Sequence, residues 1–382
     1  MRIGIDASNT RSGGMIAHVA ELLAHCDPQR HGITKVTIWG SAVILDRVPD
    51  RPWLDRVHVP WLDRRLPWRV AWQLFVRSRL ARATCDVLFA PGASPIGTFR
   101  PHVSMSANLM PFVARERARN AWSREWLRVL LLRGLQGHAF RESSAVIFLT
   151  DYARTLISSL IGLDANARTA VIPAGVNDRF RAEPRTVRPL SSYDDRAPFR
   201  FLYVSDIHPY KHQWNVAEAV ARLRREGLPV AIDFIGSPVH RRSTRRFRHT
   251  LSRLAAEKDS IRFLGTLPYD ALPAMYRDAD AFVFASTCEN LPMTLVEAMA
   301  SGLPIAASDT RPMPDILDDG AFYFDAENVS SIETALRALA LDPARRAAIA
   351  QRAHAAAAHY SWDECADRTF ALLADIARQH AG

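Results

Sequence analysis

The sequence predicts an α/β protein made of two parallel-sheet domains. At 382 residues the chain is long for one hydrophobic core and suits two domains of ordinary size. Short apolar runs alternate with helical stretches along the chain, as in parallel sheets covered by helices. Between Phe282 and Asp309 a strand, a loop, a helix and a second strand follow one another, which is one βαβ unit. Hydrophobic residues make up 48% and charged residues 23%, a composition that excludes extensive disorder.

The first half of the chain begins with a predicted strand, Arg2–Asp6, a loop at Ser12–Gly14 and an amphipathic helix over Met15–His25. Gly13 and Gly14 allow a ligand to approach the backbone at this turn, although a tight turn without a ligand is the alternative. A third glycine at the spacing of a dinucleotide fingerprint is missing, which argues against an NAD site. Further predicted strands begin or lie at Val36–Trp39, Val57–Val59, Val87–Phe89, His102–Met105, Ala145 and Val171.

Two stretches of the first half, Arg64–Ala83 and Arg115–Arg141, interleave arginine with tryptophan and leucine. On helices this spacing gathers apolar side chains on one face and surrounds them with guanidinium groups. Two interpretations remain open. The helices contact an anionic membrane surface, where arginine meets lipid phosphate and tryptophan sits at headgroup level, or they cover the sheet and expose their arginines to solvent.

A stretch rich in proline, serine and charge separates the two halves. We predict a first domain over 1–183, a linker over 184–198, a second domain over 199–359 and a terminal segment over 360–382. The helix that follows the strand at Ala145 is expected to be capped by Thr150 or Asp151.

The second half repeats the alternation of strands and helices. Its predicted strands are Phe201–Val204, the start of Ala231–Pro238, Ile261–Pro268, Ala281–Phe284 and Ile305–Ala307, and its later helices are Ser330–Leu341, Pro343–His359 and Tyr360–Gln379.

His240–Lys258 is strongly basic, but its apolar residues at Phe247, Leu251 and Leu254 predict a solvated helix rather than a nucleic-acid stripe. Asp278 and Asp280 form a D-x-D, which at a helix-to-strand junction predicts a turn rather than a metal site.

Glu289 and Glu297 are the strongest candidate functional residues. Glu289 lies in the loop after Ala281–Phe284, and ligands of parallel sheets bind beyond the carboxyl ends of strands. Glu297 lies just over one turn inside the next helix and can face the same crevice. The helix start, from Met293 onward, presents unpaired amides that favour phosphate. Carboxylates for sugar hydroxyls beside amides for phosphate predict a nucleotide sugar as ligand.

The pattern Glu289-x7-Glu297, continued by AMASGLPIAAS, resembles the signature of retaining glycosyltransferases of the GT-B fold, family four. The resemblance implies two facing Rossmann-like domains with an interdomain cleft, and a terminal helix over 360–382 that crosses back to the first domain. It implies that Glu289 holds the hydroxyls of the transferred sugar and that Glu297 holds the ribose. Lys211, one of three lysines in the chain, would grip the donor diphosphate.

The same resemblance implies a wider set of site residues and no metal or other cofactor. We expect catalytic roles for Glu289, Lys211 and Asn108. The expected contacts to the nucleotide sugar are Gly13, Gly14, Ser205, Lys211, Gly236, Asn290, Leu291, Met293, Thr294 and Glu297. Two positions depart from the family pattern: Ala107-Asn108 replaces a His-Asp pair, and Asp206 replaces an arginine. Asn108 or His138 is expected to substitute for the missing histidine.

The expected partners are a nucleoside-diphosphate sugar, with GDP-mannose as the preferred donor, and a glycan or lipid-linked saccharide acceptor in bacterial surface-polysaccharide assembly. The net charge of +9 is compatible with a phosphate-bearing substrate or an anionic membrane; nucleic acid is not expected, because only charge suggests it. Two alternatives within the resemblance are a GT-B sugar-nucleotide epimerase and a non-catalytic scaffold.

The four cysteines, Cys26, Cys85, Cys288 and Cys365, are too widely spaced for a disulfide framework or a zinc site. No apolar run approaches the roughly 18 residues that a membrane span needs, and the start of the chain has no secretion pattern. We therefore expect a cytoplasmic protein, either free or at the inner face of the cytoplasmic membrane.

Overall fold

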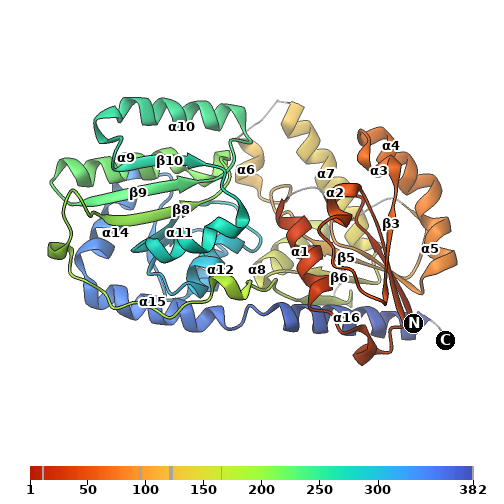
Figure 1. Cartoon of the computed structure of the whole chain (residues 1–382). Coiled ribbons are helices and arrows are strands. Elements are labelled where there is room, and N and C mark those ends of the chain that lie inside the picture. Colours follow the sequence, from red (N-terminus) through yellow and green to blue (C-terminus); the bar gives the residue numbers. More distant parts are fainter. Residues whose placement is uncertain (11–12, 94–96, 120–123, 165, 381–382) are drawn as a thin grey trace. The chain divides into compact units, whose positions relative to one another are not determined.

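The computed structural model describes residues 1–382 except 11–12, 94–96, 120–123, 165 and 381–382. The chain divides into two compact units (Figure 1). Unit 1 contains Met1–Gly175 and the segment that begins at Tyr360, and unit 2 contains Val176–His359. Each unit holds one parallel sheet with helices packed against it, which confirms the predicted α/β class with two Rossmann-like domains.

Unit 1 is built on a seven-stranded sheet in the order β3-β2-β1-β4-β5-β6-β7. Its strands are β1 Arg2–Asp6, β2 Lys35–Gly40, β3 Leu54–His58, β4 Val87–Ala90, β5 His102–Ser106, β6 Ala145–Phe148 and β7 Thr169–Val171. Its α-helices are α1 Gly13–Ala24, α2 Ala42–Leu45, α3 Pro60–Asp63, α4 Leu66–Trp72, α5 Ser78–Thr84, α6 Ala114–Ala118, α7 Arg124–Arg141, α8 Asp151–Ile161 and α16 Trp362–His380. Strands β4, β5 and β6 are buried throughout, as expected for central strands covered on both faces.

Three local predictions in unit 1 need correction or refinement. Gly13 and Gly14 form the first turn of α1 rather than a loop before it. The helix predicted over Arg64–Ala83 consists of α4, the π-helical segment η2 over Gln73–Arg77, and α5. The helix predicted over Arg115–Arg141 is present as α6 and α7, while residues 120–123 lie outside the described part. Thr150 caps α8, with its side chain accepting from the Ala153 amide.

The terminal helix α16 packs within unit 1. His25 Nδ1 lies 2.8 Å from Asp363 Oδ1, and His31 Nε2 lies 3.0 Å from Asp367 Oδ1. Gly175 leaves no room for a side chain, because a Cβ there would lie 2.2 Å from the Trp362 amide. Residues from the two ends of the chain thus belong to one unit.

Unit 2 is built on a six-stranded sheet in the order β10-β9-β8-β11-β12-β13. Its strands are β8 Phe199–Val204, β9 Val230–Ile235, β10 Ile261–Gly265, β11 Ala281–Phe284, β12 Ile305–Ser308 and β13 Phe322–Phe324. Its α-helices are α9 Gln213–Arg225, α10 Arg241–Arg253, α11 Leu272–Asp278, α12 Met293–Ala300, α13 Met313–Leu317, α14 Val329–Leu341 and α15 Pro343–Ala357. The strand order reverses between β8 and β11, the position where open α/β sheets bind ligands.

The stretch predicted as a linker, 184–198, is packed against unit 2. The structure divides the chain between Gly175 and Val176, eight residues before the predicted boundary at 183. The Tyr193 hydroxyl donates to Asp280 at 2.7 Å, and a Cβ on Gly302 would lie 2.6 Å from the Pro184 nitrogen. The residues that make these long-range contacts do not recur at a helix or strand period in the sequence. For this reason the composition of 184–198 predicted an unpacked linker.

None of the helices in the described residues has the length and apolar character needed to cross a membrane. None of the four cysteines, all of which lie in the described residues, forms a disulfide bond, and burial raises the pKa of Cys85 and of Cys365 to about 12.

Candidate functional site

The site lies in unit 2 at the carboxyl ends of β8 and β11, which are hydrogen-bonded neighbours. Two hydrogen bonds hold the loops that follow these strands together. The Thr287 amide donates to the Tyr210 carbonyl at 2.9 Å, and His212 Nε2 lies 3.2 Å from Thr287 Oγ1. His212 has a left-handed backbone conformation, with φ of 48°, at the point where the chain turns into α9.

Lys211 and Glu289 form an ion pair between these two loops. The Lys211 ammonium group donates to Glu289 Oε1, which also accepts from the Ser286 hydroxyl at 2.5 Å. The ammonium nitrogen lies 4.8 Å from the centre of the Phe284 ring, a favourable cation–π contact. The two side chains are 11% and 14% exposed, so the pair is largely desolvated but still reaches the surface. The structure thus brings together two residues that the sequence separates by 78 positions.

Glu297 is buried inside α12, and its carboxylate contacts two tyrosines. The Tyr276 hydroxyl lies 3.0 Å from Oε2, and the Tyr269 hydroxyl lies 3.2 Å from Oε1. Burial raises the pKa of Glu297 to about 7, while the tyrosine hydrogen bonds and the nearby Arg179 oppose that rise. Near neutral pH this carboxyl group therefore titrates.

The start of α12 carries the other predicted contacts of this loop. Asn290 and Leu291 are buried, whereas Met293 and Thr294 are partly exposed. The amides of Leu295 and Val296 donate to the Pro292 carbonyl. The amides of the first two helical residues, Met293 and Thr294, have no carbonyl ahead of them in the helix and are suited to an anion.

Gly236 and Asp206 have structural explanations that the sequence did not reveal. A Cβ on Gly236 would lie 2.0 Å from the Ser205 carbonyl oxygen, so only glycine permits this approach of the β9 and β8 loops. Asp206 Oδ1 accepts from the Ser237 amide at 2.9 Å. The residue in place of the family arginine thus holds the neighbouring loop in position.

His208, Tyr269 and Tyr276 are site residues that the sequence interpretation missed. The His208 ring stacks on Tyr210 at 5.2 Å, and burial, followed by the charge of Lys211, lowers the pKa of His208. His208 lies in the loop after β8, three residues before Lys211, and this position could have predicted it as a site residue from the sequence. The two tyrosines lie on η7 (Tyr269–Ala271) and α11, and nothing local in the sequence connects them with Glu297.

The predicted residues of unit 1 are exposed. Asn108 follows β5, and its Oδ1 accepts from the Met110 amide at 3.1 Å. His138 lies on an exposed position of α7. A Cβ on Gly13 or on Gly14 would meet no atom of the described residues within 4 Å.

Asp280 of the D-x-D motif is hydrogen-bonded to two other segments of unit 2. Asp280 Oδ1 accepts from the Tyr193 hydroxyl, and Oδ2 accepts from the Arg200 amide at 2.8 Å. Within the described residues, no cluster of three or more His, Cys, Asp or Glu is arranged to hold a metal ion.

Comparison with known families shows which family model the residues around this site match. Residues 194–356 match the family model described as "Glycosyl transferases group 1". The matched residues are less than half of the chain. They run from β8 into α15 and include Lys211, Glu289 and Glu297.

Two curated relatives illustrate how similarity is distributed along the chain. An O-antigen chain mannosyltransferase B from Escherichia coli is 30% identical over 109 residues, which are 28% of this chain and 29% of that protein. A GDP-mannose-dependent alpha-(1-6)-phosphatidylinositol monomannoside mannosyltransferase from Mycobacterium tuberculosis strain H37Rv is 24% identical over 96% of this chain and 95% of that protein. Several relatives, the first of these included, are matched over less than two thirds of their own length.

A solved structure supports the fold of the whole chain. The Anabaena protein Alr3699/HepE, in complex with UDP and glucose, superposes with a TM-score of 0.71 at 20% sequence identity, covering 100% of this chain and 99% of that one. At this identity the likeness concerns the fold.

Proposed function

We propose that the protein is a retaining glycosyltransferase that moves a sugar from a nucleoside diphosphate to a hydroxyl of an acceptor. The observation that supports this most is the Lys211–Glu289 pair at the carboxyl ends of β8 and β11, within the residues that match the glycosyl transferases group 1 model. A cation for phosphate and a carboxylate for sugar hydroxyls lie side by side there, next to the amides of α12.

In the proposed reaction the Lys211–Glu289 ion pair opens when the donor binds. Lys211 then contacts the diphosphate of the donor, and Glu289 contacts its sugar. The Lys211 ammonium group turns to the diphosphate and stabilises the charge that grows on it as the glycosidic bond breaks. Glu289 then accepts hydrogen bonds from the hydroxyls of the transferred sugar, while Glu297 holds the ribose. The acceptor attacks from the face that the phosphate leaves, and a phosphate oxygen takes the acceptor proton. This route needs no side-chain base, which agrees with alanine at position 107.

The proposed donor is GDP-mannose, and the proposed acceptor is a glycan or lipid-linked saccharide in surface-polysaccharide assembly. The printed names of the mannosyltransferase relatives support this choice. Thermal-shift measurements with UDP, GDP and dTDP sugars at equal concentration test the donor, and the most tightly bound one should raise Tm the most. Absence of any shift with every nucleotide would favour the non-catalytic scaffold.

Two variants test the roles of the carboxylates. Glu289→Ala should abolish transfer and leave nucleotide binding nearly unchanged, because Glu289 serves the sugar. Glu297→Ala should weaken nucleotide binding itself. Equal and small effects of both would refute the assignment. Release of nucleotide with a rearranged sugar in the absence of an acceptor would instead identify an epimerase.

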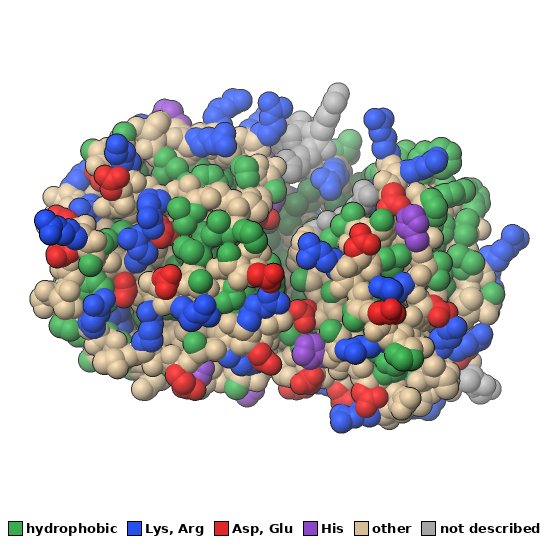
Figure 2. Space-filling model, viewed as in Figure 1, with side chains coloured by type: hydrophobic (Ala, Val, Ile, Leu, Met, Phe, Trp, Pro, Cys, Tyr) green, Lys and Arg blue, Asp and Glu red, His purple; other side chains and the backbone are tan. Residues whose placement is uncertain are grey.

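The exposed surface of α3, α4 and η2 supports a further proposal, contact with an anionic membrane. Trp61 is 37%, Trp68 46% and Phe75 75% exposed, and the Arg64 guanidinium lies 5.1 Å from the centre of the Trp68 ring. Figure 2 shows hydrophobic side chains gathered over α4 and α5. Tryptophan with neighbouring arginine suits the headgroup region of a bilayer.

Vesicle co-sedimentation tests the membrane contact. Trp68→Ala/Phe75→Ala should bind vesicles that contain phosphatidylglycerol less than the parent chain does, whereas Leu160→Ala, another exposed apolar residue of unit 1, should bind like the parent. Equal binding by all three proteins would remove this proposal.

A further inference from the structure

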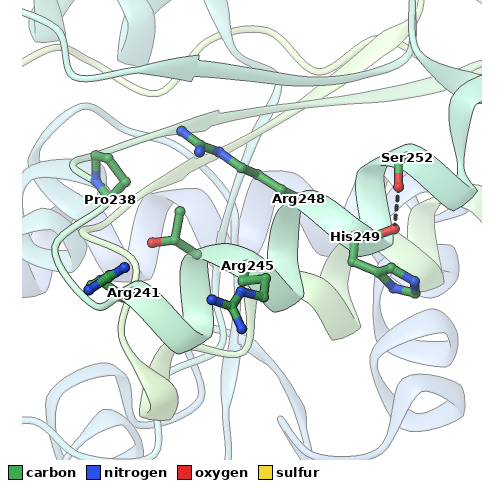
Figure 3. Close-up of a pocket in the computed structure, with 7 residues that line it drawn as sticks. Pro238, Arg241, Arg245, Arg248, His249 and Ser252 are labelled. Atoms are coloured by element: carbon green, nitrogen blue, oxygen red, sulfur yellow. Dashed lines mark hydrogen bonds between the residues drawn. The ribbon is translucent and has the colours of Figure 1, made fainter.

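A groove of about 560 Å³ runs along α10 on the surface of unit 2 (Figure 3). Residues that line it include Pro238, Arg241, Thr244, Arg245 and Arg248. Its arginines belong to the basic stretch that the sequence interpretation treated as a solvated helix. The proposed transfer reaction leaves this groove without a role.

Three guanidinium groups line the groove from one face of the helix. Arg241, Arg245 and Arg248 are spaced by four and three residues, which places them on neighbouring turns along about 10 Å of helix. All three are exposed, and among the described residues none of them forms an ion pair with a carboxylate. Arg253 on the same helix does form one, with Glu218. The row of like charges is therefore left for an external anion to neutralise.

Thr244 gives a second, independent indication of a ligand. Its side chain lines the groove and is only 7% exposed, and its hydroxyl has no hydrogen-bond partner among the described residues. A buried hydroxyl without a partner is unfavourable, and native structures rarely leave one. A phosphate oxygen in the groove would accept from this hydroxyl while the arginines neutralise its charge.

We propose that the groove along α10 binds a ligand carrying two or more phosphate groups, through Arg241, Arg245, Arg248 and the Thr244 hydroxyl. Guanidinium groups bind phosphate through paired N–H donors, and a row about 10 Å long exceeds the reach of a single phosphate. Among the described residues that line the groove there is no Trp, Tyr or Phe, the large rings on which single-stranded nucleic acid stacks its bases, and His249 contributes a single smaller ring. Neither Lys211 nor Glu289 is among the residues that line this groove.

Calorimetric titration of the full chain tests the proposal with tripolyphosphate and orthophosphate at equal ionic strength. Tripolyphosphate should bind at least about tenfold more tightly than orthophosphate, because several charge-assisted hydrogen bonds act together. Arg245→Gln/Arg248→Gln should weaken tripolyphosphate binding by at least about tenfold. Arg242→Gln is the matched control, because Arg242 is exposed on the same helix but does not line the groove, and it should change the affinity less than about twofold.

Further measurements separate this groove from the donor site and from non-specific charge. Lys211→Ala should keep tripolyphosphate binding, so failure of the proposed transfer reaction would leave this result intact. Thr244→Val should weaken the binding and raise the Tm of the free protein, since it removes a buried unpaired hydroxyl. Vesicles of phosphatidylglycerol with and without a diphosphate headgroup lipid distinguish a lipid source from a free one. If the ligand is a lipid, the diphosphate lipid should strengthen vesicle binding of the parent chain and not of the double variant.

Three results would overturn the proposal. Equal losses in the Arg242→Gln and double variants would indicate non-specific attraction. Tripolyphosphate binding that disappears in Lys211→Ala would assign it to the donor site. Tighter binding of a single-stranded oligonucleotide than of tripolyphosphate would assign the groove to nucleic acid.

Discussion

Both units place an ion pair where the order of their strands reverses, but the two pairs differ in their surroundings. In unit 1, Asp6 ends β1, next to β4, and its Oδ2 lies 2.7 Å from Arg77 Nη1 with side-chain exposures of 0% and 5%. In unit 2, the Lys211–Glu289 pair lies beyond β8 and β11, with exposures of 11% and 14%.

The surroundings explain which pair is available to a ligand. Asp6 also accepts from the Ser8 amide at 3.0 Å, and a Cβ on Gly97 would lie 2.3 Å from Arg77 Nη2, so the Asp6–Arg77 pair is enclosed by its own chain. The Lys211–Glu289 pair has an exposed edge beside the amides of α12. At the same position in the two sheets, the ion pair of unit 1 therefore stabilises the fold, whereas the ion pair of unit 2 is suited to binding a ligand.

The largest expected effect is on the enclosed pair. Asp6→Ala should lower the free energy of unfolding by about 3–5 kcal/mol, because it removes the carboxylate that balances the buried Arg77 charge. Chemical denaturation measures this loss. Asp86→Ala is the control, since it breaks the exposed Arg2–Asp86 pair and should cost no more than about 1 kcal/mol. Similar losses in the two variants would remove the distinction between enclosed and exposed pairs.

Glu297 gives the next effect, a dependence of stability on pH. Its pKa of about 7 in the folded protein lies above the ordinary value of 4.5, so the folded state retains a proton that the unfolded state loses. Stability should therefore fall as the pH rises from about 4.5 to about 7 and stay level above that range, by on the order of 3 kcal/mol. Glu297→Gln should remove this component. Unfolding curves of both proteins at pH 5 and pH 8 measure it, and identical pH dependences would contradict the prediction.

The smallest of the three effects concerns the pair that reaches the surface. Lys211→Ala should slow turnover on the order of a hundredfold, as the loss of one donor to a developing charge does at other active sites. It should cost less stability than Asp6→Ala, because water reaches Glu289. Lys35→Ala, which removes an exposed lysine paired with Asp55, should leave turnover unchanged. Unchanged turnover in Lys211→Ala would exclude the proposed role of this lysine.

The sequence by itself determined the two-sheet fold and the local frame of the site. The apolar run Ala281–Phe284, the loop with Glu289 and the helix that carries Glu297 appear in the structure where periodicity and turn residues placed them. These features depend on neighbours along the chain, so a single sequence reveals them.

Only the tertiary structure decided which side chains meet. Lys211 contacts Glu289 because β8 and β11 are adjacent in the sheet, and Tyr269 and Tyr276 reach Glu297 because η7 and α11 pack beside α12. Tertiary packing also attached the predicted linker to unit 2 and explained why position 236 must be glycine. Such contacts follow from strand order and packing between distant segments, and neither leaves a repeating pattern in the sequence.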